Sequence, residues 1–572
     1  MSRGGKIALV VVGIVIASLV LVVVAAQLAR RPAPDSVLEL RLDGSIPEQT
    51  SSDPLTRWIA GHPLGLTDYL DVLRRARDDG RIKGALVVIE RPDLGFGRIQ
   101  ELRDALRDFQ SGGKWATCYL ETAGEFSSGN KEYYLASACG EIWMAPPGDV
   151  NLIGVRAEVP FLRGTFDLLG IYPDYDHIGK YKTAKNLFTD TTMTPAYRES
   201  MDQLVGRLYA QLVAGIGEGR KMSEAEVKAL VDRGPFLGPQ ALEAKLVDGL
   251  GYRDQVEDHL RERNGGRLPL MKAGRYLKAG RFYDRGARIA VIYGIGSVSR
   301  GESDSDSMTG SATMGSDTIA KAIREAREDA SIKAIVLRVD SPGGSYVASD
   351  LIWREVSRTR GVKPIVVSMG DVAASGGYFV SMAADRIVAE PGTLTASIGV
   401  LAGKFVTTGF WNKLGITSDA VQRGRHATYF SGDQKYTPEE RVLFQQWLER
   451  IYKDFVGKVA QGRGKTYDEI HAIAQGRVWS GQDALDLGLV DELGGLPTAL
   501  RRALELAKLD PDARAQIVPM PEPGGILDHF FESGDTAVGL AGLRARIRRL
   551  IEDGPYPVGE RVLSLPYVPV IR

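Results

Sequence analysis

The sequence predicts an α/β protein in which two similar β-α-β repeats follow an N-terminal transmembrane helix. Three observations support this prediction. Short apolar runs alternate with helical patterns, segments of the first half recur 243 to 250 residues later, and one N-terminal run carries no charge. Alternation of buried strands with helices is typical of parallel sheets whose strands are joined by crossover helices.

The recurring segments keep nearly the same spacing along the chain, and chance similarity would not hold its register in this way. The matching pairs of segments are 82–89 with 332–339, 134–148 with 378–392, 153–155 with 398–400, 169–171 with 414–416, and 241–248 with 484–491. This period is too long for a solenoid and indicates a duplicated domain. We expect four parts: a membrane anchor at 1–30, a first α/β repeat at 31–270, a second at 285–510, and a C-terminal extension of unknown role at 511–572.

Within the second repeat, helices are expected at 317–327 and 346–359, and strands at 333–339 and 364–368. Three other segments have distinctive compositions. Residues 299–316 are predicted to form a mobile polar loop, 264–287 a linker, and 543–551 a basic amphipathic helix. Docking on the protein surface is the favoured interpretation of that helix, and membrane contact is the alternative.

Composition limits the classes of function. The chain has 572 residues with 72 basic and 72 acidic side chains, which argues against a nucleic-acid binder. Its 44% hydrophobic content is that of an ordinary globular protein. Two cysteines, Cys118 and Cys139, exclude a disulfide scaffold and a Cys-rich zinc site. We expect them to be buried thiols, although the sequence leaves a pairing between them open.

Residues 7–26 form an uncharged apolar run of twenty residues. At 1.5 Å per residue such a helix spans about 30 Å, the thickness of a hydrocarbon core. The run is longer than the apolar part of most signal peptides, so an uncleaved anchor is favoured over a cleaved leader. Basic residues lie on both sides of it, at Arg3, Lys6, Arg30 and Arg31, and leave its orientation open.

Two Gly-rich turns of the second repeat, 340–345 and 373–378, each separate a strand from a helix. Backbone N–H groups in such turns suit an anion, either a phosphate or the oxyanion of an acyl-transfer intermediate. The phosphate is disfavoured because no G-x-x-x-x-G-K-[ST] motif is present. Ser375 in the second turn has small neighbours that leave its hydroxyl accessible to a carbonyl. Alternatively, the small residues only permit tight packing of helix on sheet.

A nucleophilic serine needs a base. His426 is a weak candidate because Arg423 and Arg425 suggest a solvated loop, and a lysine is the other choice. The comparison of the repeats places Ser375 opposite Lys131, so the first repeat lacks the serine.

The first repeat instead offers Lys182, within residues 179–184, and it falls opposite Ala427. The first repeat thus lacks the serine, and the second repeat lacks the lysine. This complementary loss suggests one site assembled from both repeats. The plainer interpretation of Lys182 is a solvent-facing lysine, as expected for Lys180 and Lys185.

The segments GKYKTA (179–184), DSPGGS (340–345), AASGGY (373–378) and TLTASIGV (393–400) together resemble the signal peptide peptidase A family in its long bacterial form, protease IV. The resemblance covers about residues 35–510 and implies two tandem domains of the Clp/crotonase-like superfamily. It implies that Ser375 is the nucleophile and Lys182 the general base, with Ser397 supporting the lysine. Ala396 stands where the family has glycine. The oxyanion donors implied are the N–H groups of Gly376 and Gly343.

The resemblance also implies a function: a membrane-anchored Ser-Lys endopeptidase that degrades remnant signal peptides and unfolded apolar peptides through an acyl-enzyme. It implies no cofactor or metal, a homo-oligomer such as a tetramer, and a single-pass location in the bacterial inner membrane with the catalytic body on the periplasmic side. The alternatives are a crotonase-like acyl-CoA enzyme and a non-catalytic oligomeric scaffold. A lysine base must be neutral, so we expect Lys182 to be buried and away from carboxylates.

Overall fold

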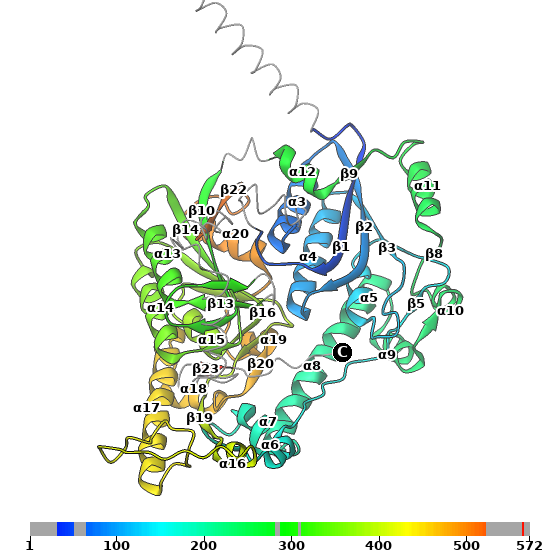
Figure 1. The fold of residues 1–572 in the computed structure, drawn as a ribbon. Helices are drawn as coiled ribbons and strands as arrows, with labels where there is room; N and C mark the ends of the chain where they lie inside the picture. The colour runs from blue at the N-terminus through cyan, green and yellow to red at the C-terminus, as the bar shows by residue number, and fades with distance from the viewer. Residues whose placement is uncertain (1–30, 51–63, 281–285, 307–310, 522–562, 565–572) are drawn as a thin grey trace, which may run out of the picture.

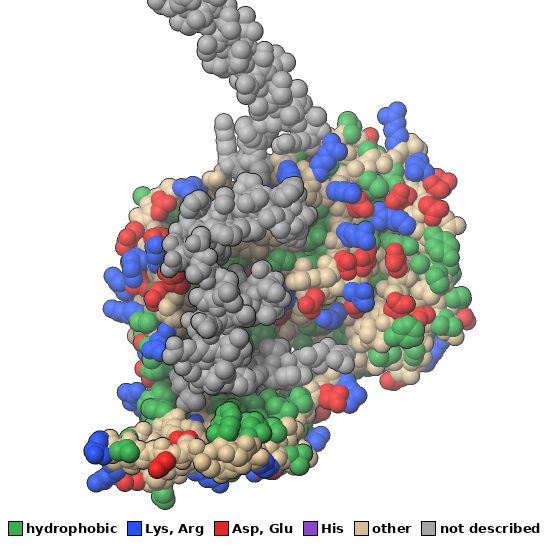
Figure 2. Space-filling model, viewed as in Figure 1, with side chains coloured by type: hydrophobic (Ala, Val, Ile, Leu, Met, Phe, Trp, Pro, Cys, Tyr) green, Lys and Arg blue, Asp and Glu red, His purple; other side chains and the backbone are tan. Residues whose placement is uncertain are grey.

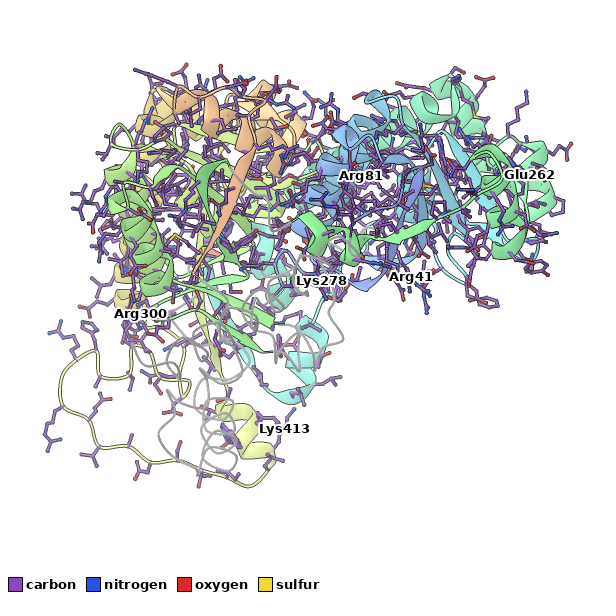
Figure 3. The ribbon with its side chains drawn as sticks, turned by 90° about the horizontal axis from the view of Figure 1, so that it is seen from above. Arg41, Arg81, Glu262, Lys278, Arg300 and Lys413 are labelled. Atoms are coloured by element: carbon purple, nitrogen blue, oxygen red, sulfur yellow. A yellow bond between two sulfur atoms is a disulfide. The ribbon has the colours of Figure 1, made fainter. Side chains whose placement is uncertain are left out.

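The computed structural model describes residues 31–50, 64–280, 286–306, 311–521 and 563–564, and these form a mixed α/β structure. We call residues 36–280 the first half and residues 286–521 the second half. Each half contains a sheet flanked by helices, and the halves lie side by side (Figures 1 and 3). Residues 7–26, the predicted anchor, lie outside the described residues. Among the described helices, none is both long enough and apolar enough to cross a bilayer.

The sheet of the first half is parallel, with strand order β8-β4-β3-β2-β1-β9. Its central strands consist of apolar and β-branched residues and are buried, as a parallel sheet covered on both faces requires. The strands are β1 (Ser36–Ser45), β2 (Ile82–Asp93), β3 (Trp115–Leu120), β4 (Glu141–Met144), β8 (Gly249–Leu250) and β9 (Leu270–Lys272).

The helices of the first half are α3 (Leu66–Asp78), α4 (Phe96–Ser111), α5 (Asn130–Ala136), α6 (Arg163–Leu169), η1 (Thr183–Lys185), α7 (Asn186–Thr189), α8 (Pro195–Arg220), α9 (Glu224–Arg233), α10 (Gly238–Glu243), α11 (Arg253–Arg263) and α12 (Ala273–Gly280). A small antiparallel pair joins β5 (Asp149–Val150) to β7 (Phe236–Leu237).

The second sheet repeats this strand order as β21-β17-β16-β14-β10-β22, and β18 and β20 continue it beside the end of β16. These strands are β10 (Ala287–Ile295), β14 (Ile332–Ser341), β16 (Ile365–Ala374), β17 (Arg386–Ala389), β18 (Leu394–Ala396), β20 (Val478–Ser480), β21 (Glu492–Leu493) and β22 (Ala515–Met520).

The helices of the second half are α13 (Ser316–Glu328), α14 (Tyr346–Thr359), α15 (Gly376–Ser381), α16 (Thr408–Lys413), α17 (Pro438–Arg463), α18 (Tyr467–Ile473), α19 (Gly481–Asp486) and α20 (Leu496–Leu506). The helices expected at 317–327 and 346–359 are confirmed as α13 and α14. In α13, Ile319, Ala322, Ile323 and Ala326 share one buried face, the period-3.6 pattern that predicts the helix.

Three expectations for the connecting segments are wrong. The supposed loop at 299–316 contains β12 (Asp304–Asp306) and β13 (Ser311–Gly315), which pair in a small sheet with β11 (Ser297–Ser299) and β15 (Gly343–Gly344). The supposed linker at 264–287 contains β9 and α12. The second sheet also extends past residue 510, because β22 pairs with β10 at its edge. The amphipathic segment 543–551 lies outside the described residues.

The expectation of two thiols is also wrong, since Cys118 and Cys139 form a disulfide. Cys118 lies on β3 and Cys139 follows α5, and both side chains are buried in the core of the first half. The chain between them folds back through α5 and so brings the two residues together, with 5.8 Å between their Cα atoms. Sequence spacing does not reveal this folding back.

Many contacts join the halves, and two of them are a strand pair and a buried ion cluster. The strand β6 (Tyr172–Ile178) of the first half pairs antiparallel with β19 (Val400–Val406) of the second. In addition, the fully buried Arg338 of the second half bonds Glu48 and Glu101 of the first half. On the face that Figure 2 shows, basic and acidic side chains are interspersed over the first half, as the zero net charge suggests.

Candidate active site

The pairing of β6 with β19 brings residues of both halves to one place. In this antiparallel pair Ile178, the last residue of β6, lies opposite Val400, the first residue of β19. The chain that leaves β6 leads to Lys182, and the chain that enters β19 carries Ser397. These two residues therefore lie at the same end of the strand pair, although they are far apart in the sequence.

Ser375 lies where β16 ends and α15 begins, with φ of 56° and ψ of −111°. This conformation is unusual for a residue with a side chain and is typical of strained functional turns. The Ser375 N–H donates to the Ala396 carbonyl over 2.7 Å, which holds the turn against the end of β18. Its hydroxyl does not cap α15, so the oxygen is available to a neighbour.

Lys182 reaches into the second half and is 1% exposed. Its Nζ lies 2.8 Å from the Oγ of Ser375, 3.0 Å from the Oγ of Ser397 and 3.0 Å from the carbonyl oxygen of Ser397. The plainer interpretation, a solvent-facing lysine, does not hold for Lys182. It does hold for Lys180, whose exposed ammonium lies near Tyr181 and Glu199.

Burial lowers the pKa of Lys182 to about 7. Desolvation is the cause, because removing the ammonium from water disfavours the charged form. Among the described residues, the hydrogen-bond partners of the amine are the uncharged oxygens of Ser375 and Ser397, and no carboxylate there raises its pKa again. A substantial fraction of this lysine is therefore neutral near pH 7, whereas a free lysine with a pKa of about 10.4 is almost entirely charged.

The segment 475–477, which was not predicted from the sequence, holds Lys182 and Ser397 in place. The N–H of Tyr181 donates to the Gln475 carbonyl at 2.7 Å, and that of Ser397 donates to the Arg477 carbonyl at 2.9 Å. Gly476 packs so closely that a Cβ there would lie 2.5 Å from the Cβ of Lys182. In the sequence this glycine indicates only a turn, so no signal pointed to the site.

The two Gly-rich turns meet beside Ser375. A Cβ on Gly376 would lie 3.0 Å from the Gly343 Cα and 3.0 Å from the Gly344 nitrogen. A Cβ on Gly377 would lie 2.6 Å from the carbonyl oxygen of Ser341. Glycine is thus required for the turns to approach each other, and this approach places several backbone N–H groups near the serine.

Gly343 and Gly344 differ in what their N–H groups face. The Gly343 N–H donates to the Ser341 Oγ at 3.2 Å, within its own turn. Gly344 lies between the neighbouring strands β11 and β23 (Leu563–Ser564), the latter from the C-terminal part of the chain. The first Gly-rich turn therefore also forms β15 of a small sheet, which pairs with β11 on one side and accepts an extended chain, here β23, on the other.

The other candidates lie elsewhere. His426 is exposed, with its Nδ1 3.7 Å from Glu440 and its ring beside that of Tyr429. Among the described residues, no group of three or more His, Cys, Asp or Glu side chains is arranged to hold a metal ion.

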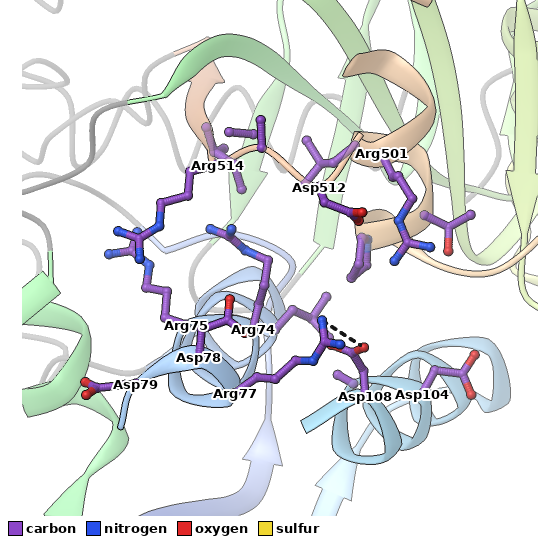
Figure 4. A pocket seen from close by; sticks show the side chains of 18 of the residues that line it. Arg74, Arg75, Arg77, Asp78, Asp79, Asp104, Asp108, Arg501, Asp512 and Arg514 are labelled. Carbon is purple, nitrogen blue, oxygen red and sulfur yellow. Dashed lines mark ion pairs between the residues drawn. The ribbon is translucent and has the colours of Figure 1, made fainter. Parts of the chain in front are cut away.

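A cavity of about 960 Å³ lies between α3, α4 and α20, and none of the predicted site residues lines it. Figure 4 shows basic and acidic side chains alternating around it, including the ion pair of Arg77 with Asp108.

A buried serine hydroxyl beside a lysine of lowered pKa, with glycine turns against it, is the arrangement of a serine hydrolase. Comparison with known proteins identifies the family. The family model described as "Peptidase family S49" matches residues 123–266 and 357–510. The chain belongs to this family and is a serine protease, which sets aside the alternatives of an acyl-CoA enzyme and a scaffold.

Three relatives illustrate the match. The chain is 33% identical to the chloroplastic serine protease SPPA of Arabidopsis thaliana, over 88% of this chain and 74% of that protein. It is 35% identical to Protease 4 of Salmonella typhi, over 78% and 72% of the two chains. It is 29% identical to Protease 4 of Haemophilus influenzae, over 84% and 81%.

Proposed function

We propose that this protease is an endopeptidase in which Ser375 is the nucleophile and Lys182 the general base. The observation that carries the proposal is the 2.8 Å contact between Lys182 Nζ and Ser375 Oγ, made across the two halves in a buried site. The pattern of partners supports a neutral amine. Two N–H groups donate to the Ser397 carbonyl and hydroxyl oxygens, which leaves the nitrogen lone pair to accept the hydrogen of the Ser375 hydroxyl.

Ser397 keeps both of its oxygens available to the amine. Its hydroxyl donates to the Gly476 carbonyl over 3.4 Å, so the lone pairs of its Oγ face the amine. Neutral partners orient the amine without raising the pKa of Lys182, which a carboxylate would do. We assign Ser397 the role of positioning the base.

The proposed reaction has two stages. Lys182 Nζ takes the proton of the Ser375 hydroxyl while Oγ attacks the carbonyl carbon of the peptide bond. The resulting ammonium gives that proton to the leaving amine, and an acyl-enzyme remains. The same lysine then takes a proton from water, which attacks the ester carbonyl. Its proton returns to Ser375 Oγ as the acid leaves.

The oxyanion formed in each stage needs N–H donors. Gly376, the first residue of α15, is one, because the first N–H groups of a helix have no partner within it. The N–H of Gly343 already has Ser341 Oγ as its acceptor, so we assign Gly344 as the second donor in place of Gly343. Losing one such donor typically costs about 3 kcal/mol of transition-state stabilisation.

The substrates we propose are extended, unfolded apolar peptides, with remnant signal peptides as the natural class. The edge of β15 accepts an extended backbone, as its pairing with β23 illustrates. The apolar run 7–26 would tether the protein to the bacterial inner membrane, where such peptides remain. A disulfide between Cys118 and Cys139 supports a catalytic body on the periplasmic, oxidising side.

The proposal includes the organisation of the chain. The matching strand orders of the two sheets support a duplication in which the first repeat supplies Lys182 and the second supplies Ser375. A homo-oligomer, such as a tetramer, is part of the same proposal and rests on the sequence resemblance alone.

The test is peptide hydrolysis by the full chain in detergent and by Ser375→Ala, Lys182→Ala and Lys180→Ala. We expect the first two variants to lose at least about 10³-fold in kcat while remaining folded. Lys180→Ala is the matched control, since this exposed lysine lies two residues away, and it should retain activity. Activity of Lys182→Ala within tenfold of the wild type would overturn the assignment of the base.

A further inference from the structure

An irregularity in β16 lies directly before Ser375. Val339 of β14 pairs with Met369 of β16, but the next pair is Ser341 with Ala373. Between these two pairs, β14 advances by two residues and β16 by four. Residues 370–372 of β16 therefore form a bulge. Bulges re-aim the chain that follows them and are common beside active sites.

The bulge is also the point at which β16 changes neighbours. Before it, residues 366–368 pair with β17, and from its last residue onward, residues 372–374 pair with β18. Ser375 follows the last of these residues, and Ser397 follows β18 by one position. The shape of the bulge therefore sets where the proposed nucleophile lies relative to the turn that holds the lysine.

Two carboxylates hold the bulge. Asp340, which begins the first Gly-rich turn, accepts the N–H of Val372 at 2.9 Å. Asp371 points out of the sheet to the first half. Its oxygens accept the N–H groups of Gly95 at 2.9 Å and Arg98 at 2.8 Å, so it caps the N-terminus of α4 from the other half.

Arg98 completes the cluster. Its Nε donates to Asp371 and lies 3.9 Å from an oxygen of Asp340 and 3.9 Å from an oxygen of Glu48. All four side chains are less than one-fifth exposed, so their attraction is screened less than on the surface. Burial and repulsion from Asp371 raise the pKa of Asp340 to about 7, and Arg98 opposes this shift.

We propose that Arg98 and Asp371 are positioning residues for the reaction at Ser375. Together they fix the bulge of β16 and, through Asp340, the first Gly-rich turn, so that nucleophile and oxyanion donors keep their relative geometry. The first half thus contributes to the site in two ways: it supplies Lys182, and through Arg98 and the N-terminus of α4 it holds Asp371 of the second half. This inference rests on the proposed function of Ser375.

The test compares kcat and KM for peptide hydrolysis by the full chain and by Asp371→Asn, Gly95→Ala, Arg98→Gln and Arg98→Lys. Gly95→Ala keeps every charge but pushes on the carboxylate, because its Cβ would lie 2.3 Å from the Asp371 Cγ. Asp491→Asn is the matched control. Asp491 also accepts a backbone N–H, that of Ile387 at 2.8 Å, and bonds an arginine, and these hydrogen bonds go to β17 and α17 and not to β16.

We expect kcat to fall by about 10- to 100-fold in Asp371→Asn, Gly95→Ala and Arg98→Gln, with KM changed less than about threefold, because misplacement of reacting groups by about 1 Å costs this much. Arg98→Lys keeps the charge and the N–H to Asp371, and it should recover at least half of the loss on a logarithmic scale. Asp491→Asn should lower the melting temperature without lowering kcat.

A kcat within twofold of the wild type in Asp371→Asn or Gly95→Ala would overturn the inference. So would an equal loss in Arg98→Lys and Arg98→Gln, or a fall in kcat in Asp491→Asn. The proposed function fails separately, by activity that persists in Ser375→Ala.

Discussion

The two halves have the same strand order, but they differ in the turn that follows the third strand of each sheet, β3 in the first half and β16 in the second. In the second half the N–H of Ser375 donates to the Ala396 carbonyl at 2.7 Å, and in the first half that of Gly129 donates to the Asn151 carbonyl at 2.9 Å. By this bond Gly129 is the counterpart of Ser375. Lys131, which the repeats of the sequence place opposite Ser375, lies two residues further along the chain.

The turn of the first half has no place for a nucleophile. A Cβ on Gly129 would lie 2.0 Å from the Ala123 carbonyl oxygen. The next two side chains are bound within the same half, Asn130 to the Gly154 carbonyl at 2.6 Å and Lys131 to the Leu94 carbonyl at 2.8 Å. The first half therefore has no room for a nucleophilic side chain at this position, and it contributes Lys182 to the site in the second half instead.

The backbone conformation at the nucleophile and its partner turn also differs from that at Gly129. Ser375, Ala396 and Ser397 all have positive φ values, of 56°, 63° and 51°, whereas Gly129 has −101°. A positive φ on a residue with a side chain costs of order 1–3 kcal/mol. In the second half, three neighbouring residues of the candidate active site have this unfavourable conformation. Such backbone strain is typical of catalytic sites.

The substitution with the largest expected effect is Ser375→Gly. It places in the second half the residue type, glycine, that the first half has at Gly129. We expect hydrolysis to fall at least about 10³-fold, because the nucleophile is lost. Glycine accepts the φ of 56° without strain, so the melting temperature should not fall and should rise by about 1–2 °C. Peptide assays and thermal melts measure both effects. A large drop in melting temperature would show that the turn is not strained.

The reverse variant, Gly129→Ser, is the control for this prediction. Its Cβ would collide with the Ala123 carbonyl, so we expect a lower melting temperature and no new activity.

The lysine that crosses between the halves predicts two pH dependences. With a pKa of about 7, Lys182 must lose its proton to act as a base, so kcat/KM should fall tenfold per pH unit below pH 7 and level off above it. A profile that stays flat down to pH 5 would contradict the lysine as base.

The same pKa affects stability. The unfolded lysine, with a pKa near 10.4, binds more protons than the folded one between about pH 7 and pH 10, so this group makes the free energy of unfolding rise with pH over that range. The slope from one lysine approaches about 1.4 kcal/mol per pH unit. Unfolding by denaturant at several pH values measures it, with Lys182→Met as the comparison. Lys182→Met should gain most in stability at pH 7 and least at pH 10, and an equal gain at both would refute the shift.

Removing a support of the lysine should have a smaller effect. In Ser397→Ala the amine keeps the carbonyl oxygen of residue 397 but loses the hydroxyl at 3.0 Å. One hydrogen bond of about 1–1.5 kcal/mol corresponds to roughly a tenfold fall in kcat. Steady-state kinetics would show it as lower kcat with little change in KM. A loss as large as that of Lys182→Ala would mean that Ser397 takes part in proton transfer itself.

Most elements of the second half could be predicted from patterns in the sequence. Fewer of the contacts that join the two halves could be predicted in this way. Strong periodicity predicts α13 and α14, and β14 contains the apolar run 334–337. The contact of Lys182 with Ser375 follows from their complementary loss in the two repeats.

Other features depend on tertiary contacts that leave no local pattern. The segment 475–477 acts through backbone carbonyls, and backbone groups are the same in every residue. Asp371 caps a helix that begins more than 270 residues earlier, and no local motif marks such a cap. The polar composition of β12 and β13 resembles that of a loop, and these short segments become strands only by pairing with each other and with β11.

The smallest predicted effect concerns the edge of β15, where the second half binds part of its own chain. Leu563 and Ser564 pair with Gly344 and Gly343, the edge at which a substrate backbone would lie. A segment held there competes with substrate, so weakening it should lower KM. Proline has no N–H and disrupts strand pairing, so we expect Leu563→Pro with Ser564→Pro to lower KM about two- to fivefold, with kcat unchanged. A synthetic peptide of residues 561–568 should then inhibit the variant more strongly than the wild type. An unchanged KM together with equal inhibition of both proteins would show that this strand does not compete with substrate at the site.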